Sequence, residues 1–285
     1  MAAQRGWLRR VSIEVVRRLR EHDVMMMAAA IAFYWLLAFI PLLLLGTSAA
    51  GYLLGSSDRA VDEVMAAARR VFPRGAGPET QEFIRTLIQS RHVTGGLGLV
   101  FLLWVVMGVF EIIATSLTTL TGGKETRSYF RRKLVALIMM STVGFLFMGT
   151  LMAGWVLAAW PNIEELLGLR LALPAFLRHP VFHRYLSSVL MAILLTVVYH
   201  IAPVQSIRWP AAIAGATIAA FLWHQAKFVY AWYLIYYGRH SLLYGILGGL
   251  IGLVLWIFYT AVILLFGGLL ADILDRGGRP QKSRS

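Results

Sequence analysis

Cysteine is absent from this sequence of 285 residues. The chain therefore has no disulfide bond, no thiolate ligand for a metal ion and no cysteine for a lipid anchor. Charged residues are also scarce, at 14% of the chain, whereas a soluble domain carries about a quarter. Hydrophobic residues make up 59%. This composition excludes an ordinary soluble domain.

Long apolar runs dominate what is present, and several reach the roughly 20 residues that cross a hydrocarbon core. We therefore expect an all-α, polytopic integral membrane protein. Residues 25–272 would form its membrane domain, between a basic cytoplasmic segment at 1–24 and a basic cytoplasmic tail at 273–285. Six transmembrane helices are expected, near residues 25–54, 97–121, 134–159, 186–202, 210–237 and 243–270.

Outside these spans the sequence predicts amphipathic helices. Apolar residues recur at helical spacing in the N-terminal segment, at Trp7, Leu8, Val11, Val15 and Leu19. Because the arginines lie mostly off this face, the pattern is typical of a helix on the cytoplasmic leaflet, although a solvated lead-in to the first span would look similar. Two further amphipathic helices, broken by the PRGAGP sequence at 73–78, are expected between residues 56 and 94 and would cap the outer side.

The formal net charge of +13 indicates how the chain is oriented in the membrane. Lysines and arginines are more frequent in the N-terminal segment, the 122–133 loop, the 203–209 turn and the C-terminal tail than in the opposite segments. The positive-inside rule then places both termini in the cytoplasm. The loop carries a basic cluster: Lys124, Arg127, Arg131, Arg132 and Lys133. It predicts either a topology anchor or a site for anionic headgroups, and we expect membrane lipids rather than nucleic acid as partners.

The fifth predicted span contains polar residues at depth. His224, Lys227 and Tyr230 share one face of a helix, whereas Gln225 points away. A lysine inside a span costs roughly 2.5–3.5 kcal/mol on insertion scales unless it faces protein or water. Glu111 lies near the middle of the second span, so two opposite charges occur at similar depth.

Two interpretations of this polar set stay open. In the first, a polar cavity binds a substrate or relays a proton. Its lining would be Glu111, His224, Lys227 and Tyr230. In the second, Glu111 and Lys227 form a buried ion pair that fixes the packing of two helices. Pro41 bends the first span in either case, as a structural kink or as a hinge.

Small residues predict where helices approach each other closely. Glycines four residues apart form two overlapping pairs in the sixth span: Gly245 with Gly249, and Gly248 with Gly252. Such residues let another backbone come close. Their expected partner is the small face of the fifth span, formed by Gly215 and Ala219. Near the cytoplasmic end, Tyr199, His200 and Arg208 are expected to be interface residues rather than ligands.

A metal-dependent nuclease would need clustered His and acidic ligands at defined spacing. The histidines are scattered along the chain, and His179 and His183, although four apart, have Pro180 between them and no glutamate. Neither an H-E-x-x-H pattern nor a Gly-rich phosphate loop occurs. We therefore expect no enzymatic activity, no metal site and no cofactor.

The last three predicted spans resemble a known family. Their sequences, YHIAP, RWPAAIAGATIAAFLWHQAKFVYAWY and YGILGGLIGLVLWIFYTAVILLFGGLL, are similar to those of the YihY/BrkB family of bacterial inner-membrane proteins. AAAIAFYWLLAFIPLLL and the GGKETRSYFRRK loop resemble that family's first span and basic loop, so the resemblance covers about residues 10–272. It implies six spans in the bacterial cytoplasmic membrane and a link to envelope integrity and serum resistance. Many members carry the label ribonuclease BN, which the residues of this chain do not support.

These features together favour a transporter-like protein that moves or exposes an envelope lipid or a small anionic solute. The polar set, the bend at Pro41 and the basic loop motivate this hypothesis. A scaffold or assembly factor for envelope machinery, which transports nothing, is the alternative. No ATP-binding motif is present, so transport would be passive, ion-coupled or driven by a partner. An oligomer is compatible with the sequence.

Overall fold

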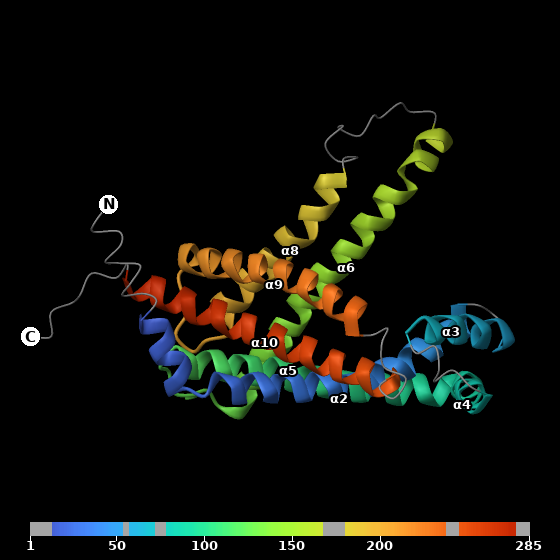
Figure 1. Ribbon diagram of the computed structural model, residues 1–285, viewed down its shortest axis with the longest axis horizontal. Helices are drawn as coiled ribbons and strands as arrows, with labels where there is room; N and C mark the ends of the chain where they lie inside the picture. The colour runs from blue at the N-terminus through green and yellow to red at the C-terminus, as the bar shows by residue number, and fades with distance from the viewer. Residues whose placement is uncertain (1–12, 54–56, 72–77, 168–179, 238–244, 278–285) are drawn as a thin grey trace, which may run out of the picture. The chain divides into compact units, whose positions relative to one another are not determined.

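The computed structural model describes residues 13–53, 57–71, 78–167, 180–237 and 245–277. In these ranges the chain is helical apart from short connections, as the sequence predicts (Figure 1). A helical segment at 13–21 comes first. The helices that follow are α2 (Val24–Leu53), α3 (Ser57–Val71), α4 (Pro78–Gln89), α5 (Arg91–Leu120), α6 (Tyr129–Leu167), α8 (Pro180–Ile201), α9 (Trp209–Tyr237) and α10 (Gly245–Gly277).

The chain forms two compact units, each built from segments that are distant in the sequence. Unit 1 contains Met1–Val24, Ile113–Gln225 and Ile263–Ser285. Unit 2 contains Met25–Ile112 and Ala226–Val262. Three described helices, α5, α9 and α10, therefore contribute several turns to both units, and α2 belongs to unit 2 except for its first residue, Val24.

Within the described ranges, the helices long and apolar enough to cross a membrane are Val24–Tyr52, Gly95–Leu120, Tyr129–Gly149 and Ile251–Gly277. They correspond to the first, second, third and sixth predicted spans. The fourth predicted span matches a shorter apolar helix, Ser188–Ile201. The fifth matches α9, whose hydropathy is lowered by His224, Gln225 and Lys227. The all-α fold is confirmed, and the number of six spans stays a prediction.

Local sequence explains where helices of unit 1 begin and end. Pro210 lies in the first turn of α9, where a missing amide hydrogen costs nothing. α5 ends in a Schellman motif, in which Gly122 has a positive φ of 65°. The amide of Gly122 donates to the carbonyl of Thr119, and that of Gly123 donates to the carbonyl of Thr118. α5 therefore stops sharply, and the carbonyl that follows its last turn can accept a bond from another segment.

α8, α9 and α10 meet at glycines of unit 1. A Cβ atom added at Gly215 would lie 2.5 Å from the carbonyl oxygen of Gly267, and one at Gly267 would lie 2.6 Å from Ala219 Cβ. The fully buried Tyr199 also packs on Gly267 and donates its hydroxyl to the carbonyl of Leu264 at 2.8 Å. Such a close approach of backbones requires glycine on α9 and on α10.

This packing corrects two predictions. α10 is the expected partner of Gly215 and Ala219, and the contact that the structure describes is at Gly267, later in that helix than the predicted glycines. Of those earlier glycines, Gly252 is buried. The surroundings of the other three lie outside the described residues: Gly245, Gly248 and Gly249. Tyr199 is a core residue rather than an interface residue, because its ring fills the space that the glycines leave.

The helical segment at 13–21 packs on protein. Val15 is buried in a cluster with apolar residues of α10, namely Leu269, Leu270 and Ile273. Leu19 is half-buried against the same cluster. The prediction that this face lies on lipid is therefore wrong for Val15 and Leu19, because α10 covers their apolar atoms. The other predicted members of the face, Trp7, Leu8 and Val11, lie outside the described residues.

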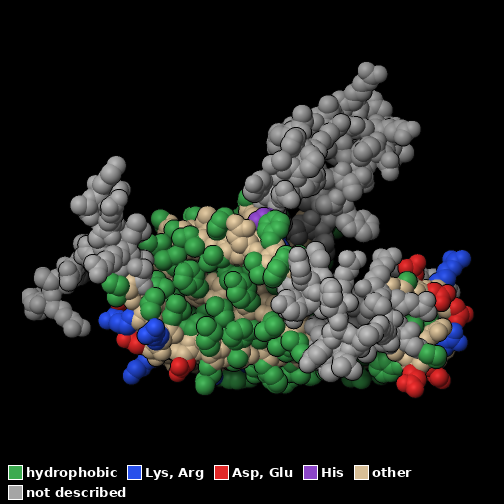
Figure 2. Space-filling model, in the orientation of Figure 1, with side chains coloured by type: hydrophobic (Ala, Val, Ile, Leu, Met, Phe, Trp, Pro, Cys, Tyr) green, Lys and Arg blue, Asp and Glu red, His purple; other side chains and the backbone are tan. Residues whose placement is uncertain are grey.

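In unit 2, α3 and α4 pack against each other. Ala60, Val61 and Met65 of α3 are buried in one cluster with Ile84 and Ile88 of α4. This confirms the two amphipathic helices predicted for this part of the chain. Charged side chains cover the outside of the pair (Figure 2), and its position on the outer side of the membrane stays a prediction.

Candidate functional site

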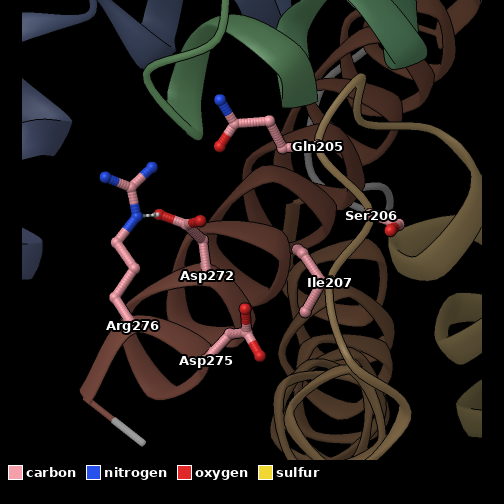
Figure 3. A pocket seen from close by; sticks show the side chains of 6 residues that line it. All are labelled: Gln205, Ser206, Ile207, Asp272, Asp275 and Arg276. Atoms are coloured by element: carbon pink, nitrogen blue, oxygen red, sulfur yellow. Dashed lines mark ion pairs between the residues drawn. The ribbon is translucent and has the colours of Figure 1, made fainter. Parts of the chain in front are cut away.

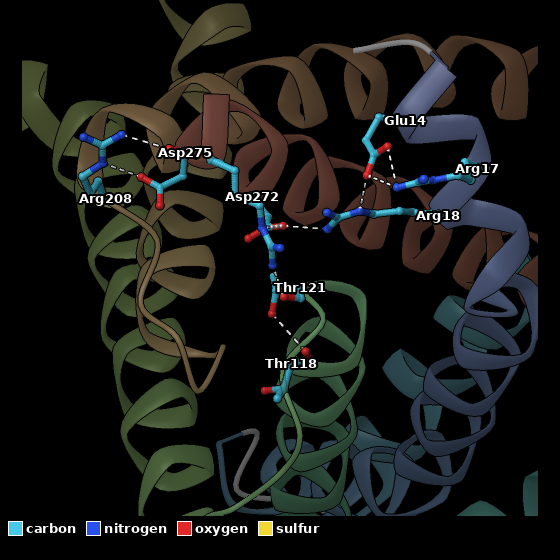
Figure 4. Close-up of polar contacts among 9 residues, drawn as sticks. Glu14, Arg17, Arg18, Thr118, Thr121, Arg208, Asp272 and Asp275 are labelled. Carbon is cyan, nitrogen blue, oxygen red and sulfur yellow. Dashed lines mark hydrogen bonds and ion pairs between the residues drawn. The ribbon is translucent and has the colours of Figure 1, made fainter. Parts of the chain in front are cut away.

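The last two turns of α10 carry two acidic residues that are almost completely buried. Asp272 is 6% exposed and Asp275 is 2% exposed. Asp272 Oδ2 accepts from Arg18 Nη1 at 2.9 Å and from Arg276 Nε at 2.7 Å. Asp275 Oδ1 accepts from Arg208 Nε at 2.5 Å (Figure 4). Buried carboxylates need such partners because an unpaired charge inside a protein is costly. We call these five residues the arginine–aspartate network.

Other bonds from arginines tie helix ends together in the same unit. Arg276 also donates to the carbonyl of Thr121, just beyond the end of α5. Arg127 donates from Nη1 to the carbonyl of Ala202 at 2.9 Å and from Nη2 to that of Pro203 at 2.7 Å. Carbonyls at helix C-termini lack donors within the helix. These arginines therefore supply the missing donors and connect α5 to α10, and the loop before α6 to the end of α8.

A pocket of about 120 Å³ adjoins the network (Figure 3). Its lining comes from the turn before α9 and from the end of α10: Gln205, Ser206, Ile207, Asp272, Asp275 and Arg276. Two carboxylates, a guanidinium and two uncharged polar side chains thus surround a space that suits water molecules or a small polar ligand. Because arginines pair with both carboxylates, the pocket does not present an excess of negative charge.

Asp272 and Asp275 are not among the residues that the sequence pattern singles out. The sequence predicts that the last span ends at residue 270, which puts both aspartates at or beyond its end, whereas α10 continues to Gly277. The available signal is their spacing: two acids three residues apart, directly after an apolar run, lie on one side of a helix. Their partners Arg18 and Arg208 come from distant segments, so the sequence does not reveal the pairing.

The predicted polar set is divided between the two units. Glu111, Lys227 and Tyr230 belong to unit 2, and His224 belongs to unit 1. All four side chains are half-buried.

Pro41 lies inside α2, which is helical on both sides of it. Its role as a hinge stays a prediction.

Two members of the polar set have described partners within their own unit. Tyr230 packs against Trp256 of α10, with ring centroids 4.8 Å apart. His224 Nδ1 lies 3.1 Å from Ser188 Oγ of α8. None of the four residues lines the pocket beside the network. Over the described part of the chain, no group of three or more His, Asp or Glu side chains could hold a metal ion.

The residues of the basic cluster differ in their contacts and in their exposure. Arg127 ties its loop to α8, as described above. Lys133 Nζ lies 5.5 Å from the ring centre of Tyr129, within the range of a cation–π contact. Lys124 and Arg131 are exposed. The headgroup site predicted for the cluster stays a prediction.

Comparison with known proteins identifies relatives of this chain. It is 23% identical to the putative ribonuclease-like protein YfkH of Bacillus subtilis strain 168, over 92% of this chain and 94% of that protein. It is 26% identical to a UPF0761 membrane protein of Tolumonas auensis, over 91% and 83% of the two chains. It is also 22% identical to one of Aggregatibacter aphrophilus, over 90% and 89%. No solved structure matches the chain. Residues 15–285 match the family described as virulence factor BrkB, and the chain therefore belongs to that family, whose members include membrane proteins.

Proposed function

We propose that this protein is transporter-like and moves or exposes an envelope lipid or a small anionic solute across the bacterial cytoplasmic membrane. The observation that carries the proposal is Lys227, a half-buried cation within α9, a helix that is otherwise largely apolar. A lysine at such a depth costs roughly 2.5–3.5 kcal/mol on insertion scales. A charge that costs this much is more often functional than incidental. An anionic group that enters the membrane is a suitable ligand for it.

Glu111, in the same unit as Lys227, supports the proposal. It is half-buried in α5, within one of the helices apolar enough to span a membrane. In the proposed mechanism Lys227 binds the anionic group, and Glu111 balances the lysine charge once that group has left. Tyr230, three residues after Lys227 and packed on Trp256, offers a hydroxyl on the same side of α9. His224, three residues before Lys227, is the fourth proposed member.

The proposed orientation has both termini in the cytoplasm. Four segments of unit 1 are joined by bonds from one arginine each: Arg18, Arg127, Arg208 and Arg276. These segments are the helix at 13–21, the loop before α6, the turn before α9 and the end of α10. Arginines of four segments thus lie at one end of unit 1, and the positive-inside rule is consistent with that end facing the cytoplasm.

A scaffold that transports nothing is the competing function. The arginine bonds to helix ends favour it, because they would hold several helices rigidly at one end. In that case Glu111 and Lys227 would act as a strut between helices. Ribonuclease activity, which the name of the Bacillus subtilis relative suggests, is not part of the proposal, because the sequence has no ligand pattern for a metal nuclease.

Native mass spectrometry of the gently extracted protein tests the proposal. Wild type would be compared with Lys227→Met, and Gln225→Leu serves as a matched control because Gln225 lies on the same helix with an exposed side chain. We expect a lipid or anion to co-purify with wild type and Gln225→Leu and to be lost from folded Lys227→Met. If folded Lys227→Met retains the ligand, or if none of the three proteins carries one, the proposal fails and the scaffold is favoured.

A further inference from the structure

The helix at residues 13–21, hereafter the strap, is attached to the end of α10 in two ways. Its apolar part is Val15, which is buried in the cluster on α10, with Leu19 half-buried beside it. Its polar part is Arg18, whose Nη1 donates to Asp272 Oδ2 at 2.9 Å (Figure 4). The attachment thus combines a small apolar contact with an ion pair between side chains that are 13% and 9% exposed.

Both members of this ion pair keep a second partner on their own helix. Arg18 Nε donates to Glu14 Oε1 at 2.8 Å within the strap. Arg276 Nε donates to Asp272 Oδ2 at 2.7 Å within α10. Separating a buried ion pair is ordinarily costly because it leaves a charge uncompensated. Here both charges would stay compensated, so the strap can leave α10 at a much smaller cost.

The strap is also a helix separate from α2. Asp23, between them, has a left-handed φ of 46°, a conformation that a continuous right-handed helix does not contain. Val24, the first residue of α2, is buried. Rotation about Asp23 would therefore move the strap without unwinding α2.

We propose that the strap is a releasable latch: it docks on α10 through the ion pair between Arg18 and Asp272, and it leaves α10 when this pair breaks. In the docked state the strap covers the apolar cluster at the end of α10. In the released state this cluster is uncovered and Asp272 retains its bond from Arg276. Asp272 also lines the pocket, so release of the strap changes the pairing of a residue in the pocket wall. The latch does not depend on the proposed transport function.

The absence of cysteine allows a direct distance measurement. Two introduced cysteines can carry spin labels with no background from native thiols. Arg20→Cys on the strap and Gly277→Cys at the end of α10 are suitable because both positions are exposed, and a Cβ atom at Gly277 would meet no atom within 4 Å. Pulsed electron double resonance on the full chain in lipid nanodiscs then measures the distance between them. The docked strap should give a single, short distance.

Two variants remove the ion pair in different ways. Arg18→Gln removes the positive charge on the strap and leaves the ion pair between Asp272 and Arg276 in place. Asp272→Asn removes the negative charge on α10. Each should shift a large share of molecules to a longer and broader distance, with unchanged helical content by circular dichroism. Asp275→Asn is the matched control, because it breaks the pair with Arg208 one turn away and should keep the docked distance.

The outcomes are distinguishable. An unchanged docked distance in Arg18→Gln and in Asp272→Asn would overturn the proposal. Equal undocking in Asp275→Asn would overturn it as well, because the end of α10 would then be loosened in general. If Asp272→Asn does not fold, Arg18→Gln decides alone, because this variant leaves Asp272 paired with Arg276.

Discussion

Alanine at Gly215 should force α9 away from α10. The added Cβ would lie 2.5 Å from the carbonyl oxygen of Gly267 and 2.7 Å from Ala271 Cβ. Ordinary van der Waals contact begins at 3.4 Å, so the two helices must separate by about 1 Å. The nearest atom belongs to the backbone and cannot rotate out of the way. Tyr199, which packs on Gly267, would lose contact as well.

The expected change in unfolding free energy follows from two opposing terms. Overpacking of a tight contact costs about 1–3 kcal/mol. Alanine recovers about 0.5–1 kcal/mol relative to glycine in a helix, because it restricts the unfolded chain. Gly144→Ala in α6 isolates the second term, since a Cβ atom there meets nothing within 4 Å. Gly215→Ala should therefore be less stable than Gly144→Ala by about 1–3 kcal/mol.

Reversible unfolding in mixed micelles measures this difference. The fraction of sodium dodecyl sulfate is raised stepwise in dodecyl maltoside, and circular dichroism follows the loss of the native state. Comparing the two alanine variants cancels the helix-propensity term, which they share. If Gly215→Ala unfolds at the same detergent fraction as Gly144→Ala, the close approach of α9 and α10 at this glycine is refuted.

Two further predictions concern charged residues of unit 1. Arg127→Lys keeps the charge but loses the planar fork that serves the carbonyls of Ala202 and Pro203, so it should cost about 1.5–3 kcal/mol in the same assay, whereas Lys124→Gln at an exposed position should cost nothing measurable. Equal stability of these two variants would contradict the tie between the loop and α8. Burial raises the pKa of Glu14, but hydrogen bonds from Arg18 and Arg17 hold it, on balance, below its ordinary 4.5. Glu14 therefore stabilises the fold above that value and loses its contribution as the pH falls through the lower, folded pKa, so the melting temperatures of wild type and Glu14→Gln should converge in acid. A difference that persists at low pH would contradict this assignment.

Hydropathy predicted the helices well because membrane helices satisfy their own backbone groups and need only apolar side chains. It failed at the end of α10, which continues through Asp272 and Asp275 to Gly277. On a hydropathy scale two acids end a span. In the structure, arginines from distant parts of the chain pair with both acids and offset the free-energy cost of burying their charges. Such long-range pairing has no local signature in one sequence.

The register between α9 and α10 is a second feature that the sequence pattern could not predict. Small residues show that another helix can come close, and Gly215 with Ala219 correctly indicates which face of α9 does so. α10 contains several glycines that could receive this face, including Gly252 and Gly267. The contact at Gly267 also involves Tyr199 of α8. The register therefore depends on three helices at once, which a pairwise pattern cannot specify.

The surroundings of the polar set, which contains Glu111, His224, Lys227 and Tyr230, were predictable only in part, because they too depend on contacts between helices. A charge in an apolar run is visible in the sequence, so Glu111 and Lys227 stand out, and both are half-buried in the structure. Their functional role stays a prediction. Which other side chains surround a charge is a property of the packed chain. His224 contacts Ser188, and Tyr230 contacts Trp256. Both contacts join two helices, so the spacing of residues along one helix cannot predict them.

The basic residues of this protein show why a charge count is an incomplete guide to function. The positive-inside rule treats lysines and arginines alike, and it needs only their number near each side of the membrane. Arg127 and Arg276, however, donate to carbonyls beyond helix ends, and Arg18 and Arg208 pair with buried aspartates. Lysine at these four positions would preserve this count, and the orientation that the rule predicts would not change. It would not preserve the forked donors, so the helix ends would separate in a correctly inserted chain. The predicted orientation thus rests on the charge of these residues, whereas the integrity of this end of unit 1 depends on the geometry of their donors.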